Sequence, residues 1–302
     1  MSDGIKLARV ICALIDEPWL LTPAKHRKLT EIAVAHMNGS HEAADAFRLE
    51  NERIWQPEMR ATKGSSGSRI ADNGGIVTDK GVAVLPIEGV IGRKFSMFLN
   101  SSGVVSIDVL DEMLRECAAR SDVRAVVLQF DSPGGSAAGV EDTAAEIAAL
   151  NAKKPCIAFA DGQCCSAAYW MASQCCAIYG IRSADVGSVG VYMALLDESR
   201  AYEMDGYKTE LFKAGKLKAM GVPGTSLNDE QRAFLQARVD GLYAKFVANV
   251  RGGRAGRTIP DEDLQGQSHD AEAAVRNGLM DSVTTRQQAI DDADYLAKMR
   301  GL

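Results

Sequence analysis

The stretch D-G-Q-C-C-S-A-A-Y-W-M, residues 161–171, lies where an apolar segment gives way to a helical one. The apolar run at 156–160 predicts a buried strand, and residues 167–173 predict the first turns of a helix. Ser166 is thereby placed at a strand-to-helix turn, beside the free N–H groups of a helix start, which can stabilise a developing oxyanion. The alternative is that Ser166 is a helix N-cap, since serine is among the commonest caps.

The composition is that of an ordinary globular protein, with 302 residues, 46% hydrophobic and 25% charged. The formal net charge of −6 argues against a nucleic-acid-binding surface, which is usually basic. Seven cysteines, an odd number in a long chain, predict reduced thiols rather than a disulfide framework. The apolar run at 5–21 is interrupted by charges and a proline, so it predicts neither a signal peptide nor a membrane span. We expect a cytoplasmic protein without nucleic-acid or membrane partners.

The chain divides into three predicted parts. Residues 1–59 predict an N-terminal helical arm, because apolar residues recur at helical spacing up to a break at Pro18-Trp19 and T-P-A-K, residues 22–25, then predicts a new helix start. Residues 60–76 contain many Gly, Ser and charged residues and predict a flexible linker. Residues 77–302 predict the main domain with a C-terminal helical assembly segment.

Within the main domain, apolar strands alternate with helices. Strands that are apolar throughout, rather than at every second residue, predict a mostly parallel sheet covered on both faces, which is an α/β fold. The first strands are expected at 82–91, 124–130 and 156–160, with helices at 106–119 and 138–150. The later elements are expected as strands at 177–179, 189–193, 208–212 and 280–283 and helices at 197–204, 229–250, 261–265 and 270–277.

A serine nucleophile needs a base, and the alternating strand–helix core contains no histidine. The four histidines, His26, His36, His41 and His269, lie in the N-terminal arm and in the C-terminal segment. A Ser-His-Asp triad stays open, because the members of a triad meet in space rather than in sequence.

A lysine base is the other possibility, and Lys218 lies in the glycine-punctuated loop F-K-A-G-K-L-K-A-M-G, residues 212–221. Lys213 and Lys216 are its rivals. A lysine acts as a base near pH 7 only if burial lowers its pKa by roughly 2–3 units from about 10.4. The alternative is that all three are solvated lysines of a loop.

Two glycine loops are candidates for completing the site. D-S-P-G-G-S, residues 131–136, follows the second strand, and its glycines allow close approach of a ligand to backbone N–H groups. The carboxyl ends of neighbouring parallel strands converge on one crevice, so the N–H groups of Gly135 and Ala167 are candidate oxyanion donors. G-S-V-G, residues 187–190, could bring the Ser188 hydroxyl to the same crevice. The alternative is that both are ordinary turns.

The paired cysteines at 164–165 and 175–176 suggest a metal site only weakly. Zinc ligands usually come as C-x-x-C with a second pair on another loop, and nothing in the sequence completes such a set. Buried thiols that pack around the serine helix are the better interpretation, with a Cys165 nucleophile as a minor alternative. We expect no metal and no cofactor, since the sequence has neither a P-loop nor a dinucleotide fingerprint.

Six blocks of the chain, taken in order, resemble consecutive blocks of the signal peptide peptidase A family of Ser-Lys proteases. The resemblance covers residues 80–285 and is strongest to the membrane-free phage branch, the capsid assembly (prohead) proteases. The blocks are V-A-V-L-P-I-E-G-V-I, D-S-P-G-G-S, D-G-Q-C-C-S-A-A-Y-W, G-S-V-G-V, F-K-A-G-K-L-K and G-Q-S-H-D-A-E-A-A-V-R-N-G-L-M-D.

The resemblance implies a fold, an assembly and a set of roles. The family's fold is the crotonase-like/Clp-like α/β spiral, and its members form rings in which neighbouring subunits complete each other's sites. The long helix at 229–250 is then an expected assembly surface. The implied roles are the nucleophile (Ser166), the general base (Lys218), the lysine-orienting hydroxyl (Ser188) and the backbone oxyanion donors (Gly135 and Ala167).

We therefore expect a serine endopeptidase with a Ser166-Lys218 dyad that cleaves scaffold, capsid or portal proteins, and itself, during phage prohead maturation. It would act in the host cytoplasm or inside the prohead. Two departures bear on this expectation. Ala167-Ala168 stand where members often carry glycine, and a helical arm replaces the N-terminal anchor of the membrane-bound members.

Three other functions stay open. They are a general cytosolic peptidase of the same family, an acyl-CoA enzyme of the same fold, and a catalytically inactive scaffold component. An acyl-CoA enzyme would not need Ser166 together with Lys218, and a scaffold component would tolerate the loss of both.

Overall fold

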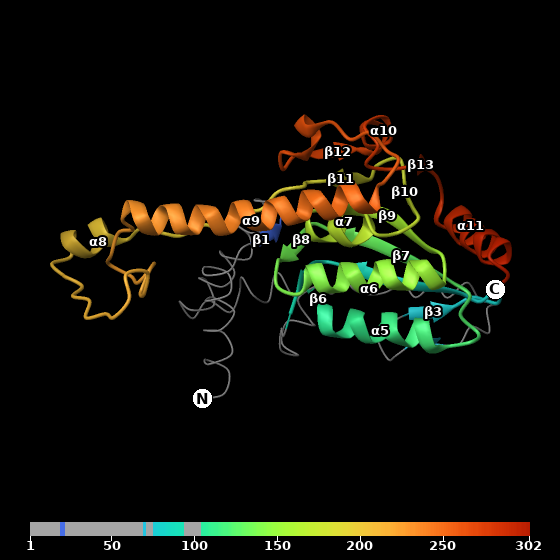
Figure 1. Cartoon of the computed structure of the whole chain (residues 1–302), viewed down its shortest axis with the longest axis horizontal. Coiled ribbons are helices and arrows are strands. Elements are labelled where there is room, and N and C mark those ends of the chain that lie inside the picture. The colour runs from blue at the N-terminus through green and yellow to red at the C-terminus, as the bar shows by residue number, and fades with distance from the viewer. Residues whose placement is uncertain (1–18, 22–68, 71–74, 94–103) are drawn as a thin grey trace, which may run out of the picture.

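A parallel sheet of apolar strands forms the centre of the molecule (Figure 1). The computed structural model describes residues 19–21, 69–70, 75–93 and 104–302. Strands β4 (Val82–Glu88), β7 (Ala125–Ser132) and β9 (Cys156–Cys165) lie side by side and run parallel. Nearly all their apolar side chains are buried, because helices cover both faces of the sheet.

Alternate residues of each strand serve two separate layers of the core, as the two-residue period of a strand requires. Ala83 and Leu85 of β4 belong to the larger layer, under α5 (Ile107–Ala119), α6 (Val140–Lys153) and α7 (Ala167–Ala172). Val82 and Val84 pack on the opposite face against α11 (Arg286–Met299). The predicted α/β architecture with a mostly parallel sheet is therefore confirmed.

Strand β9 changes its neighbour half-way along. Its first half pairs in parallel with β10 (Ala177–Gly180) and its second half with β11 (Asp185–Gly187). Further strands continue the sheet at its edges. They are β12 (Ser268–Asp270) beside β11, β13 (Ser282–Val283) beside β10, and β3 (Gly75–Val77) and β2 (Arg69–Ile70) beyond β4.

A second, smaller sheet lies at the carboxyl ends of β4 and β7. Its order is β1 (Trp19–Leu21), β8 (Gly134–Ser136), β5 (Val90–Gly92) and β6 (Val104–Ser106). Strand β5 continues β4 after Gly89, and β8 continues β7 after Pro133. Both turns thus bring the chain from the large sheet into the small one beside α7, with which β8 is in contact.

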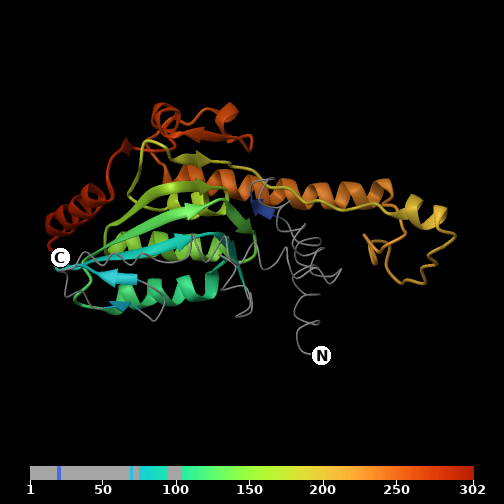
Figure 2. The same cartoon turned by 180° about the vertical axis from the view of Figure 1, so that it is seen from behind.

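Helix α9 (Asp229–Gly253) begins far from the sheet and ends against it (Figures 1 and 2). A capping box starts it, in which the Asn228 side chain accepts from the Gln231 N–H and the Gln231 side chain accepts from the Asn228 N–H. Its C-terminal half packs on α7, while α8 (Ser199–Met204) and the segment 205–226 lie at its outer end. Helix α10 (Ala271–Arg276) follows a 3-10 turn at Asp261–Leu264.

Two predicted strands are wrong. Residues 208–212 are irregular and mostly exposed, and in the described ranges no strand lies beside them to accept their backbone hydrogen bonds. The strand expected at 189–193 lies earlier, at 185–187, because Gly187 (φ 110°) and Ser188 (φ 51°) turn the chain out of the extended conformation.

Two short strands of the large sheet include residues that the sequence assigns to the linker. Residues 69–70 and 75–76 of the predicted linker belong to β2 and β3 of the large sheet, and Ile70 is fully buried. In the predicted helical arm, residues 19–21 form strand β1, and the rest of that arm lies outside the described residues. Throughout the part of the chain that is described, no helix is both long and apolar enough to cross a bilayer.

Candidate active site

Ser166 occupies the single residue between β9 and α7 and has an unusual backbone conformation. Its φ is 56° and its ψ is −116°, a region that residues other than glycine rarely enter. Its hydroxyl caps no helical N–H, so the capping interpretation of the sequence is excluded. A strained serine at a strand-to-helix turn is the backbone geometry of a nucleophile elbow, and the strain costs about 1–3 kcal/mol. In the single chain the serine is buried, at 1% exposure.

The neighbouring backbone holds this turn in place. The Ser166 N–H donates to the Gly187 carbonyl at 2.7 Å, and the Ser166 carbonyl accepts from the Trp170 N–H at 2.9 Å. The side chains of α7 are all buried, and the Trp170 ring stacks on Phe246 of α9 with centroids 4.6 Å apart. Strand and helix together therefore fix the conformation of the serine.

The Ser188 loop lies directly beside this turn, because the Ser166 N–H donates to the carbonyl of Gly187, the residue before Ser188. The Ser188 N–H donates to the Gln267 carbonyl at 2.8 Å, and its hydroxyl donates to the Gly266 carbonyl at 3.2 Å. The structure thus brings the two serines near each other, with the second hydroxyl engaged by a backbone carbonyl.

The glycines of the predicted D-S-P-G-G-S loop lie in strand β8. A Cβ on Gly135 would lie 1.7 Å from the Ile91 carbonyl oxygen, so no other residue fits at that position. The Ser132 hydroxyl donates to the Gly89 carbonyl at 2.6 Å and accepts from the Gly134 N–H at 3.2 Å, which ties β8 to the end of β4. The Gly135 strand and the helix that begins at Ala167 lie against each other.

Strand β1 covers the outer edge of β8, a feature that the sequence did not suggest. Leu20 lies opposite Gly135 in an antiparallel ladder, with Trp19 opposite Ser136 and Leu21 opposite Gly134. The predicted helix break at Pro18-Trp19 was the only signal in the sequence near this segment.

Lys218 lies in a different part of the molecule from Ser166. It belongs to the irregular segment 205–226 at the outer end of α9, away from α7 and β9 in both views (Figures 1 and 2). Its side chain is exposed and, among the described residues, has no ion-pair partner. Its rivals are engaged locally, since the Lys213 ammonium donates to the Lys216 carbonyl and Lys216 pairs with Glu230 at 3.7 Å. One protomer alone does not bring Lys218 to Ser166.

The one histidine of the described ranges, His269, does not supply the base either. It lies on β12, and β11 separates that strand from β9. Its Nε2 is 3.4 Å from the Asp263 carbonyl oxygen and 3.6 Å from the Asp263 carboxylate. The geometry therefore gives no support to a Ser-His-Asp triad at His269.

The cysteines around the Ser166 turn supply neither a nucleophile nor a metal site. Burial raises the pKa of the Cys165 thiol to about 12, and the nearby Asp185 carboxylate acts in the same direction. A thiol that stays protonated near neutral pH is a poor nucleophile, which argues against the Cys165 alternative. Cys164 and Cys175 are buried as predicted, whereas Cys176 is exposed. Within the described part of the chain, no three His, Cys, Asp or Glu side chains are placed to hold a metal ion.

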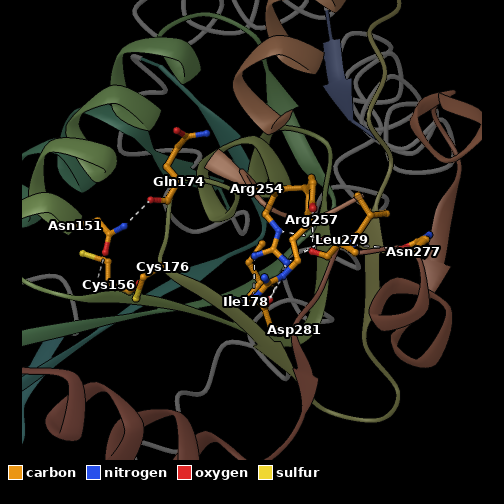
Figure 3. A network of polar contacts seen from close by, with 12 residues as sticks. Asn151, Cys156, Gln174, Cys176, Ile178, Arg254, Arg257, Asn277, Leu279 and Asp281 are labelled. Carbon is orange, nitrogen blue, oxygen red and sulfur yellow. Dashed lines mark hydrogen bonds and ion pairs between the residues drawn. The ribbon is translucent and has the colours of Figure 1, made fainter. Parts of the chain in front are cut away.

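A buried ion pair anchors the inner end of α9 (Figure 3). The Arg254 guanidinium donates to both carboxylate oxygens of Asp281, at 2.8 and 3.0 Å, and to the Gly278 carbonyl. The same carboxylate accepts from the Ile178 N–H at 2.7 Å and from Arg257 at 2.6 Å. This pair fixes the C-terminal end of α9, the helix that follows the Lys218 segment, to β10 and to the residue before β13. Sequence patterns alone did not indicate this role.

The electrostatics of this pair are set by opposing effects. Burial of the Asp281 carboxylate acts to raise its pKa, but hydrogen bonds and charge from Arg254, together with the Ile178 N–H and Arg257, outweigh it. The pKa of Asp281 is therefore held below its usual value, and the carboxylate is ionised at neutral pH.

A mostly parallel α/β sheet with a strained serine at a strand-to-helix turn defines a hydrolase-like site. The sequence profile of peptidase family S49 matches residues 148–300, which includes Ser166, Ser188 and Lys218. This match covers half of the chain, and the protein belongs to peptidase family S49.

Two phage proteins are among the similar relatives. The head-tail preconnector protein GP5 of Enterobacteria phage P21 is 30% identical over 94% of this chain and 56% of its own length. The capsid assembly protease C of Escherichia phage lambda is 28% identical over 94% of this chain and 64% of its own length. The chain thus spans less than two thirds of either relative. An enoyl-CoA hydratase/carnithine racemase from Magnetospirillum magneticum is similar in structure, with TM-score 0.40 and 13% identity over 74% of this chain and 72% of that one.

Proposed function

We propose that this protein is a serine endopeptidase in which Ser166 is the nucleophile. The observation that carries the proposal is the backbone conformation of Ser166, with φ 56° and ψ −116°. The Ser166 hydroxyl does not cap α7, so it is not engaged by the helix start. Strain of this kind is kept where the surrounding structure over-determines it and function requires it. Membership of peptidase family S49 supports the same chemistry.

In the proposed site, backbone N–H groups hold the oxyanion. Ala167 is the first residue of α7, so its N–H has no partner within the helix. Gly135 lies on β8, which packs against the same helix. A preorganised donor of this kind contributes about 2.7–4 kcal/mol to transition-state stabilisation.

The proposed base is Lys218 of a neighbouring copy, which enters the site when subunits assemble. The segment around α8 exposes large apolar side chains that a lone protomer would leave in water, among them Leu196, Met204 and Phe212, of which Phe212 is 95% exposed. Exposed apolar groups concentrated in one segment are typical of an interface. Repeated head-to-tail contact through it would build a homo-oligomeric ring.

The reaction follows from these roles. In the assembled site, the Lys218 amine of the neighbouring copy acts as the general base in its neutral form. It takes the proton of Ser166 Oγ as that oxygen attacks the peptide carbonyl, and the proton then passes to the leaving amine. Water hydrolyses the acyl-enzyme by the same proton route. The Ser188 hydroxyl, beside the turn, would orient the amine.

We propose scaffold, capsid and portal proteins, and the chain itself, as substrates during phage prohead maturation in the host cytoplasm or inside the prohead. The support is the pair of relatives, one named as a capsid assembly protease and the other as a head-tail preconnector protein.

The test is cleavage of casein by Ser166→Ala, by Lys218→Ala and by an equal mixture of the two. Each variant alone should be inactive. The mixture should recover about a quarter of wild-type activity, because in a random ring one site in four combines an intact serine with an intact lysine from the next copy. Full activity of either single variant would exclude the dyad. A mixture that stays inactive would exclude a base from the neighbouring copy.

A further inference from the structure

The starting observation is the pairing of β1 with β8. Residues 19–21 are separated from 134–136 by more than a hundred positions in the sequence, yet they form an antiparallel ladder of three residue pairs. On its other side, β8 pairs with β5 through Ile91 and Gly135. Strand β1 therefore occupies the edge of β8 that would otherwise be open.

That edge is where an extended peptide would bind in the proposed site. A peptide can add to an open strand edge through main-chain hydrogen bonds, which makes the binding tolerant of sequence. Gly134 and Gly135 give this edge no side chains to obstruct such a peptide, and β8 contacts the helix that starts after Ser166. The edge therefore fits an extended polypeptide lying antiparallel to β8.

The register of β1 sets its middle residue opposite Gly135, the proposed oxyanion donor on β8. Leu20 lies opposite Gly135, so the backbone of the segment covers the residue whose N–H would bind the carbonyl of a substrate. A second polypeptide cannot pair with the same edge while the segment remains there, because each strand edge accepts one neighbour.

We propose that Trp19–Leu21 is an intramolecular occupant of the substrate-binding edge and that it inhibits the chain until it is displaced. This inference rests on the proposed function, whose substrates would bind at that edge. If the segment fills the edge in about nine molecules of ten, the apparent dissociation constant of a competing peptide rises about tenfold.

The first test is a binding measurement that needs no activity. A fluorescein-labelled peptide with the sequence of residues 15–24, I-D-E-P-W-L-L-T-P-A, is titrated into the full chain carrying Ser166→Ala, and into the same chain with Leu20→Pro added. Proline fixes φ and lacks a backbone N–H, so it disfavours a strand ladder. The matched control is Leu20→Ala, which keeps the backbone N–H. The Leu20→Pro chain should bind the peptide about tenfold more tightly than the other two. Equal binding by all three chains would overturn the proposal.

The second test measures cleavage of fluorescein-labelled casein by the chain with Ser166 intact. Leu20→Pro should lower KM about tenfold and leave kcat at or above the wild-type value, while Leu20→Ala stays near wild type. A strand with only a structural role would instead give a less stable Leu20→Pro variant with unchanged or higher KM, which contradicts the proposal. If the wild-type chain and the variants all leave casein intact, the proposed function fails, and the peptide titration still decides whether Trp19–Leu21 competes for the edge.

Discussion

The buried pair between Arg254 and Asp281 offers the sharpest test of what fixes α9 to the sheet. The substitution is Arg254→Ala. The Arg254 side chain is 3% exposed and the Asp281 side chain 10% exposed, so the variant leaves a buried carboxylate short of its main partner. The Gly278 carbonyl loses its two hydrogen bonds from the guanidinium as well.

The expected loss of unfolding free energy depends on the contacts that Asp281 keeps in the variant. Removing one partner of a buried ion pair typically costs 3–5 kcal/mol of unfolding free energy. Arg257 still donates to the Asp281 carboxylate, so we expect the lower end of that range, about 3 kcal/mol. In a domain of this size that loss lowers Tm by about 6–12 °C.

The matched control is Arg251→Ala on the same helix. Arg251 pairs with Asp261 at the surface, where the two side chains are 44% and 88% exposed. Exposed pairs contribute about 0–1 kcal/mol, so this variant should unfold close to wild type. The assay is urea unfolding followed by tryptophan fluorescence. A cost for Arg254→Ala below about 1 kcal/mol, or equal to that of the control, would refute the anchoring role.

Three further outcomes can be checked in the same way. Gly135→Ala should abolish casein cleavage and lower Tm, because its Cβ would lie 1.7 Å from the Ile91 carbonyl oxygen, whereas Gly241→Ala on α9, with nothing within 4 Å, should leave Tm unchanged or raise it. Phe246→Ala should cost about 3–5 kcal/mol in urea unfolding, since a fully buried ring that stacks on α7 is removed. The difference in unfolding free energy between wild type and Asp281→Asn should shrink between pH 7 and pH 3. The lowered pKa of Asp281 stabilises the fold above the unfolded-state value near 4, and that contribution is lost as the pH falls through the folded-state pKa.

The sequence predicted the central sheet well because its signal is local. The runs at β4, β7 and β9 are apolar throughout, and only a strand covered on both faces needs that pattern. The turn at Ser166 was predictable for the same reason, since it lies where one local pattern ends and the next begins. The strain at Ser166 was not, because it depends on hydrogen bonds to Gly187 and Trp170.

Long-range pairing explains what the sequence did not predict. Strand β1 forms by pairing with β8, which is more than a hundred positions away in the sequence. A segment of three residues is too short for its own pattern to predict a strand. The predicted strand at 208–212 failed for the converse reason, since its apolar residues lack a partner strand in the described part of the chain. Arg254 and Asp281 likewise resemble surface charges until the fold places them together.

Two separate requirements for activity follow from the proposals, and protein concentration distinguishes them. Entry of Lys218 from a neighbouring copy depends on mass action, so specific activity should fall when the protein is diluted below the dissociation constant of the ring. Release of Trp19–Leu21 is intramolecular, so the ratio of KM between wild type and Leu20→Pro should be the same at every concentration at which rings persist. Casein cleavage measured over a hundredfold dilution series tests both statements, with light scattering to follow the oligomer. A specific activity that is independent of concentration while the rings dissociate would remove Lys218 of a second copy from the site. A KM ratio that changes with dilution would place β1 at a contact between subunits instead of within one chain.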